Sequence, residues 1–189
     1  MDMKGNLVTL RLSTLADHRT IYDWFANSDL TASMAGKPLF PDSPPATWEE
    51  FCEDHTPHFF EGEITEMGRC FIMQVDGDDV GQIYFNDIEE HNGVKRVELD
   101  MWMCAERFCG KGYGSDALET LCGFLAKRFG VEQFMVQPSA RNRRARRAYE
   151  KVGFASLDVS LEDAVKEWGP NDYFDSVYMV KVIKKTGHD

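Results

Sequence analysis

Long apolar runs are missing from this sequence, and none approaches the roughly 20 residues that a helix needs to cross a bilayer. Residues 1–6 also lack the basic start and the apolar stretch of a secretory signal peptide. These two absences predict a cytoplasmic protein that has no membrane partner.

Cysteine is scarce as well. The chain has five cysteines, an odd number, and no Cys-x-x-Cys pair. A disulfide framework or a zinc site is therefore not expected. His55 and His58 lie three positions apart, but Pro57 stands between them and a metal ion would need more ligands. We expect no metal cofactor.

Positive charge is in deficit. The 21 lysines and arginines face 32 aspartates and glutamates, which gives a net charge of −11. A chain of this charge repels the phosphates of nucleic acids, so we expect no nucleic-acid partner. Cationic small molecules or basic peptides are the partners that the charge favours.

The length and the pattern of the chain predict one α/β domain over residues 1–189. An antiparallel meander in the middle is followed by a β-α-β-α order, which indicates a mixed, mostly antiparallel sheet flanked by helices. The expected strands are residues 6–12, 70–75, 80–87, 94–104, 131–137, 154–159 and 173–183. The expected helices are residues 14–27, 47–60, 113–129 and 141–151. Residues 36–45 hold four prolines and form a loop, either a lid over a substrate or an inert connector. The sequence does not decide the oligomeric state, and a homodimer stays open.

A glycine-rich loop stands between the strand at 94–104 and the helix at 113–129. Its residues are Cys109, Gly110, Lys111, Gly112, Tyr113 and Gly114. Glycines at alternate positions let successive N–H groups point into one concavity, and a helix N-terminus adds partial positive charge there. Such a loop binds a diphosphate, although a tight turn without a ligand would look the same.

A second motif follows the next strand. Residues 141–147 hold five arginines, and Ala145 and Tyr149 recur at helical spacing on another face. In an acidic chain this local positive patch, which includes Arg144, suits an anionic ligand. The alternative is a solvated helix face.

The two motifs together resemble the GNAT superfamily of acetyltransferases. The resemblance rests on Gly110-x-Gly112-x-Gly114 at the head of one helix and on Asn142-x-x-Ala145-x-x-x-Tyr149-Glu150-Lys151-x-Gly153-Phe154 on the next. It implies the acyl-CoA N-acyltransferase fold, with acetyl-CoA as cosubstrate and an amine as acceptor.

By the same resemblance, the amides of residues 109–114 hold the CoA diphosphate. Asn142 contacts the pantetheine arm or nearby backbone, within a binding set that includes Arg144 and Ala145. Tyr149 protonates the departing thiolate. Cys109 stands where the family often has Gln or Arg, so Arg107 or Lys111 is expected to supply the positive charge instead.

The strand at 94–104 is expected to meet the acceptor. Alternation places Glu98, Asp100 and Trp102 on one face, where two carboxylates need water or a ligand beside them. Asp100 is the first candidate to bind or deprotonate the amine, and Glu98 is the second. Either one could instead pair with Lys95, Arg96 or another sheet residue.

In the related enzymes this strand splays from its neighbour and admits the acetyl group. Met101, Trp102 and Met103 are therefore placed in the cofactor set. A backbone amide near Met103 is expected to polarise the thioester carbonyl.

Within the superfamily, residues 137–142 and 149–151 are similar to the aminoglycoside 6′-N-acetyltransferases. The carboxylate of Asp100 matches a substrate-binding position of that group, whereas Gln137 departs from it, because some of those enzymes have aspartate there. The acceptor is thus expected to be a cationic, aminoglycoside-like amine. A protein N-terminal acetyltransferase, a non-catalytic acyl-CoA-binding module and a nucleic-acid binder are the alternatives.

Overall fold

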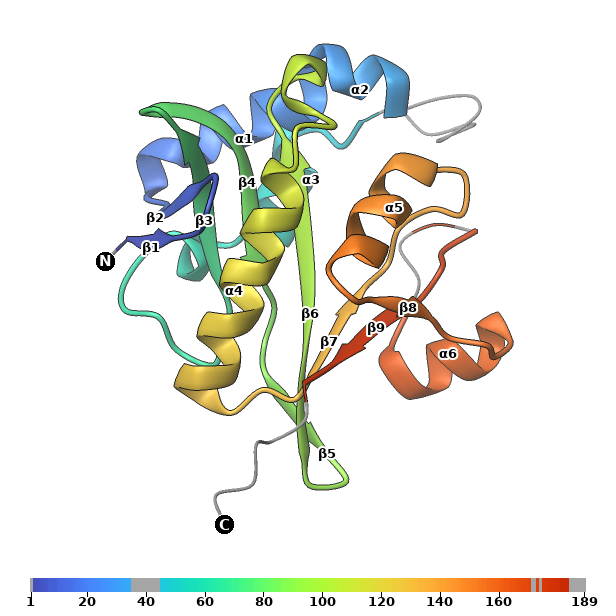
Figure 1. Ribbon diagram of the computed structural model, residues 1–189. Helices are drawn as coiled ribbons and strands as arrows, with labels where there is room; N and C mark the ends of the chain where they lie inside the picture. Colours follow the sequence, from blue (N-terminus) through green and yellow to red (C-terminus); the bar gives the residue numbers. More distant parts are fainter. Residues whose placement is uncertain (1, 35–44, 171–172, 174, 184–189) are drawn as a thin grey trace.

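A single mixed sheet forms the centre of the molecule (Figure 1). The computed structural model describes residues 2–34, 45–170, 173 and 175–183. Within them the strands run in the order β1-β2-β3-β4-β6-β7-β9-β8, and β5 pairs with β6. The pairing of β6 with β7 is parallel, and the other strand pairs of the sheet are antiparallel. The mostly antiparallel mixed sheet expected from the sequence is confirmed.

The strands are β1 (Met3–Lys4), β2 (Thr9–Leu12), β3 (Arg69–Val75), β4 (Asp78–Phe85), β5 (Glu89–His91), β6 (Val94–Met103), β7 (Gln133–Val136), β8 (Ala155–Ser156) and β9 (Met179–Val182). The helices are α1 (Leu15–Asn27), α2 (Asp29–Met34), α3 (Trp48–Asp54), α4 (Tyr113–Phe129), α5 (Arg143–Lys151) and α6 (Leu161–Trp168). Two short 3₁₀ helices, η1 (Pro57–Phe59) and η2 (Glu106–Phe108), stand in the connections.

The helices cover both faces of the sheet. Leu118 and Leu121 of α4 share a buried core with Phe71 of β3. On the other face, Ile21 of α1 packs with Ile72 of β3 and with α3. Alternate residues of one strand therefore enter two separate cores, as the pleat requires. Figure 1 shows α4 crossing the sheet and α5 lying beside β7.

Helix starts were predicted well because they carry local signals. Thr14 and Thr47 form capping boxes with Asp17 and Glu50, and α4 has the predicted bounds. The helix expected over 47–60 is wrong in its second half, because α3 ends at Asp54 and η1 follows.

The C-terminal expectations also need correction. The strand expected over 154–159 shrinks to β8, and the strand expected over 173–183 shrinks to β9. Between them lies α6, which the sequence reading missed. Ser160 caps this helix by accepting the N–H of Asp163 at 3.1 Å, a signal that was present in the sequence.

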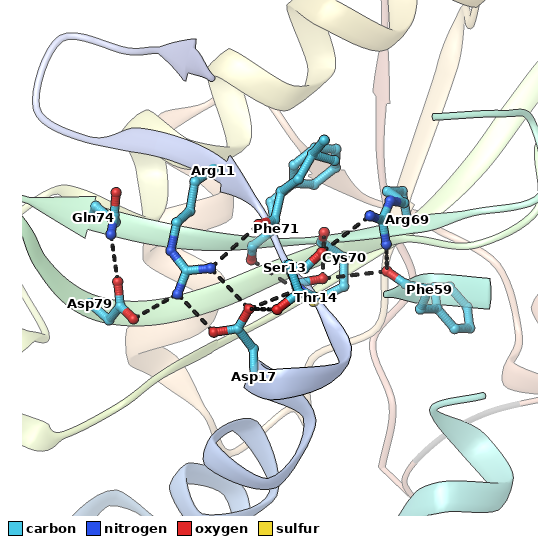
Figure 2. Close-up of polar contacts among 11 residues, drawn as sticks. Arg11, Ser13, Thr14, Asp17, Phe59, Arg69, Cys70, Phe71, Gln74 and Asp79 are labelled. Atoms are coloured by element: carbon cyan, nitrogen blue, oxygen red, sulfur yellow. Dashed lines mark hydrogen bonds and ion pairs between the residues drawn. The ribbon is translucent and has the colours of Figure 1, made fainter. Parts of the chain in front are cut away.

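An arginine in β2 ties α1 to the sheet (Figure 2). The guanidinium of Arg11 donates to Asp17 of α1 and to Asp79 of β4, each at 2.8 Å. Burial raises the pKa of Asp17, but hydrogen bonds from Arg11 and Thr14 outweigh it and hold that pKa below its usual range. The network fixes the start of α1, a helix that also lines the cavity described below.

Within the described residues, no helix is long and apolar enough to span a bilayer. In the same part of the chain, no group of three or more His, Cys, Asp or Glu side chains is placed to hold a metal ion. The loop expected over residues 36–45 falls, apart from Pro45, outside the described residues.

Candidate functional site

The sheet opens between its two parallel strands. β6 and β7 pair only from Arg96 opposite Gln133 to Glu98 opposite Met135. Beyond Glu98, β6 continues to Met103 along β4, on its other side. Figure 1 shows the two strands diverging at this end. The edge of β6 that faces β7 is therefore exposed to an opening in the sheet.

Backbone amides of β6 point into this opening. Asn86 N–H donates to Glu98 O at 3.0 Å, and Cys104 N–H donates to Val80 O at 2.9 Å, so the even-numbered residues of β6 bond to β4. Because hydrogen-bonding direction alternates along a strand, the amides of Met101 and Met103 face the opening. The Met101 N–H donates to its neighbour Asp100 Oδ1 at 2.8 Å. An oxygen of a ligand in the opening would find donors at these amides, of which the Met101 N–H is shared with Asp100.

The glycine-rich loop lies at the head of α4. Gly112 is the N-cap, with a φ of 89°, and Gly110 has a φ of 74°. Both conformations favour glycine, because a Cβ strains the backbone there. Gly114 lies on the first turn, where an added Cβ would approach Met101 Cε to 3.0 Å. The loop thus brings main-chain N–H groups and a helix N-terminus close to β6.

A carboxylate inside α4 holds this helix end in place. Asp116 accepts the N–H groups of Asn6, Leu7 and Val8 at 2.9, 2.7 and 2.9 Å. Burial raises the pKa of Asp116, but the three amide donors outweigh it and lower that pKa below its usual range. The turn between β1 and β2 therefore anchors the loop, which the sequence reading did not foresee.

Helix α5 forms the facing wall. Asn142 is its N-cap, and its Oδ1 accepts the Ala145 N–H at 3.1 Å. Ser115 Oγ donates to Ala148 O at 3.3 Å, which joins the start of α4 to α5. Tyr149 is buried, and its ring centroid lies 6.0 Å from that of Phe154. The cap and the buried tyrosine give α5 a fixed face toward the glycine-rich loop.

A cavity of about 590 Å³ runs through the opening. It is bounded by the β6 segment, the glycine-rich loop, the turn after β7, α5 and three helices of the N-terminal half. Its lining includes these predicted site residues: Asp100, Met101, Trp102, Met103, Cys109, Gly110, Gly112, Tyr113, Gly114, Asn142, Arg144, Ala145 and Tyr149. Residues from separate parts of the chain are thus collected around one space.

The two carboxylates of β6 have different surroundings. Asp100 is exposed and lines the cavity. Glu98 accepts Gln137 Nε2 at 3.1 Å and Asn86 Nδ2 at 3.4 Å, and it lies outside the lining. Lys95 and Arg96, the cations considered as structural partners, form ion pairs with other carboxylates. Asp100 is therefore better placed than Glu98 to meet a ligand.

Two predicted cofactor residues lie beside the cavity rather than in its lining. Arg107 and Lys111 are both exposed, and their charges lie 4.5 and 5.7 Å from the ring centroid of Phe108, which does line the cavity. Arg144 lines the cavity, and its guanidinium forms a bidentate ion pair with Glu106 of η2.

Several lining residues were not predicted. The cations Arg143, Arg147 and Lys151 come from α5, where the arginine run had pointed to the helix but not to these positions. Phe25 and Phe51 come from α1 and α3. Their apolar spacing was visible in the sequence, but it also fits an ordinary core stripe.

The thiol of Cys109 is half-buried in the loop. Burial raises its pKa above the usual value, although the charge of Arg144 acts in the opposite direction. The side chain is therefore a neutral thiol at pH 7 and does not repel an anion.

Comparison with known proteins agrees with this fold. The model of the acetyltransferase (GNAT) domain family matches residues 8–155. An aminoglycoside N(6′)-acetyltransferase type 1 of Klebsiella pneumoniae is 27% identical over 157 residues, which cover 78% of this chain and 73% of the relative. An uncharacterized protein of Aquifex aeolicus (strain VF5) is 36% identical over 102 residues, 54% of each chain. The solved structure of aminoglycoside acetyltransferase AAC(6′)-Ib with coenzyme A has a TM-score of 0.66 at 22% identity, covering 93% of this chain and 94% of that one.

Proposed function

The chain belongs to the GNAT acetyltransferase family, whose acetyl donor is acetyl-CoA, and we propose that it transfers the acetyl group to a primary amine of a cationic small molecule. One observation carries the proposal. Around one cavity, at the opening between β6 and β7, lie a glycine-rich helix N-terminus, strand amides that face the opening, Asp100 and Tyr149.

The donor half is built for an anion. The amides around Gly110 and Gly112 and the N-terminus of α4 would hold the CoA diphosphate. Arg143, Arg144 and Arg147 add positive charge along α5, in a chain whose net charge is −11. The pantetheine arm would then run between α5 and β6 toward the opening.

The chemistry is a direct attack in a ternary complex. The amine nitrogen bonds to the thioester carbonyl carbon, and the C–S bond breaks. The Met103 amide polarises the carbonyl oxygen. Asp100 takes the amine proton, directly or through water, and Tyr149 gives its proton to the CoA thiolate. The products are an N-acetylated amine and coenzyme A.

The curated relatives guide the choice of acceptors. The Klebsiella relative is named an aminoglycoside acetyltransferase, so aminoglycosides belong in the first panel. Polyamines, simple monoamines and short peptides with free N-termini complete it, because the acidic chain favours cationic acceptors in general.

A thiol-release assay with acetyl-CoA tests the transfer, and calorimetry with coenzyme A tests the donor site. We expect saturable CoA binding and release of free thiol with at least one amine class. Saturable CoA binding without transfer to any amine would indicate a non-catalytic module, and no CoA binding at all would refute the proposal.

Two glycine variants on α4 sharpen the donor test. In Gly112→Ala the new Cβ strains a φ of 89° and approaches Leu7 Cδ1 to 3.3 Å, so the loop must shift. We expect the Kd for CoA to rise about tenfold or more, equivalent to about 1.4 kcal/mol. Gly123→Ala is the matched control, because nothing lies within 4 Å of its added Cβ. Equal affinities in the two variants would remove the diphosphate site from the loop.

A further inference from the structure

The cavity has two ends of different character. One end lies against the glycine-rich loop and α5. The other, which we call the acceptor end, is lined from α1 to α3 and β6 by Ile21, Phe25, Leu30, Phe51, His55 and Trp102. Gln82 of β4, opposite Trp102, is a polar neighbour there, but most of these side chains are apolar or aromatic.

The rings of the acceptor end are held by one another. The Phe25 ring meets that of Trp102 edge-on at 5.2 Å, and lies 6.5 Å from Phe51. Trp102 Nε1 donates to Trp24 O at 3.1 Å, which fixes the indole against α1. Ile21 and Phe51 are each only 2% exposed, so the wall behind the rings is packed core. This surface is preorganised for a flat apolar group.

The charges are divided between the two ends. Among the described lining residues, the arginines and the lysine all come from α5, and Asp100 is the one carboxylate. His55 carries no charge at pH 7, because burial lowers its pKa to about 4. The acceptor end thus offers a single negative group beside an aromatic wall.

We propose that the preferred acceptor is a small primary monoamine with an aromatic body, such as an arylalkylamine. One ammonium or amine group would lie at Asp100, and the ring would pack against Phe25 and Trp102. A polycation would have to bring further ammonium groups into the same space, where the described lining gives them no second carboxylate, and each would lose hydration without a charged partner. The inference rests on the proposed acetyl transfer and narrows its substrate.

The first test compares kcat/KM across acceptors at saturating acetyl-CoA. The panel is phenethylamine, ethylamine, spermine, kanamycin and a phenylalanine-initiated peptide amide. We expect phenethylamine to exceed each of the others by about tenfold or more, since a well-fitted apolar group discriminates on this scale. A preference for spermine, kanamycin or the peptide would overturn the inference and leave the acetyl transfer intact. No transfer to any amine would refute the proposed function itself.

The second test removes an aromatic side chain from the acceptor end. Phe25→Leu keeps an apolar side chain but removes the ring, and Phe25→Ala removes most of the contact with Trp102. We expect the ratio of kcat/KM for phenethylamine over ethylamine to fall about tenfold in the alanine variant and less in the leucine variant. The Kd for CoA should stay unchanged in both, which also reports folding.

Phe129→Ala is the matched control. This ring lies in α4 beside Phe124, with 6.3 Å between centroids, and is outside the cavity lining. The acceptor ratio of this control should equal that of the wild type. If Phe25→Ala and Phe129→Ala gave the same ratio, the aromatic wall would have no part in choosing the acceptor.

Discussion

Replacing Tyr149 with phenylalanine separates the chemistry of its hydroxyl from the packing of its ring. The residue is 5% exposed, and its ring lies 6.0 Å from that of Phe154, a contact that phenylalanine retains. Only the oxygen that would protonate the CoA thiolate is lost. A positioned general acid contributes about 10²–10⁴-fold to the rate.

The lower bound of that range sets the expectation. We expect kcat to fall about a hundredfold, which raises the barrier by about 2.7 kcal/mol at 1.36 kcal/mol per tenfold. The Kd for CoA should change by no more than about twofold, because the loss is confined to the transition state. Thiol release under single-turnover conditions gives the chemical rate, and calorimetry with coenzyme A gives the affinity.

Tyr178→Phe removes the same atom from a structural tyrosine and serves as the control. Its hydroxyl donates to Gly169 O at 2.7 Å, the residue is 3% exposed, and it lies outside the cavity lining. This variant should lose about 1 kcal/mol of stability and keep its turnover. If both tyrosine variants turned over at the same rate, the proton would come from another group, and the assignment of Tyr149 would be refuted.

Three further substitutions probe the site and its support. Asp100→Asn should lower kcat/KM for the amine about a hundredfold while CoA binding persists. If the steady-state kinetics of this variant matched those of the wild type, another group would have to be the base. Glu106→Gln should tighten CoA binding about threefold in calorimetry at low salt, because it releases Arg144 from its ion pair and removes a carboxylate near the bound anion. An unchanged or weaker affinity would argue against a contact between Arg144 and CoA. Asp116→Asn should destabilise the fold by about 1–2 kcal/mol in thermal melts at pH 7, because a buried carboxylate accepts three amides there. The pKa of Asp116 is lower in the folded than in the unfolded chain, so the carboxylate stabilises the fold fully above the unfolded pKa of about 3.9. This stabilisation is lost as the pH falls through the folded pKa. If the stability difference between wild type and variant grew on acidification, the argument would be contradicted.

The local structure of the proposed donor half was readable from sequence because its signals are local. Gly112 caps α4 and Asn142 caps α5, and both positions carry residue types that such caps favour. The alternation that placed Asp100 and Trp102 on one face of β6 is also a short-range property. Each inference needed only a few consecutive residues.

The remaining features depend on contacts between distant segments. The three amides that Asp116 accepts come from residues more than 100 positions away. Helix α6 was missed because the expected strand ended at residue 159 and the cap at Ser160, directly after it, was not recognised. The sequence around Phe25 shows only that it belongs to an apolar face of a helix. Whether that face meets the core or a cavity depends on where β6 and β7 separate.

The two ends of the cavity are built from different parts of the chain, which bears on specificity within the family. The proposed donor half would use main-chain amides and helix ends, which tolerate changes of side chain as long as the glycines and caps remain. The acceptor end is made of side chains from β6 and from α1 to α3, and substitutions there alter shape and charge without touching the loop at Gly110. A fold can therefore be kept at 22% identity, as it is here, while the side chains that choose a substrate change. In the proposed site, Asp100 and the rings around Phe25 choose the amine, and substitutions at those positions should redirect the acetyl transfer.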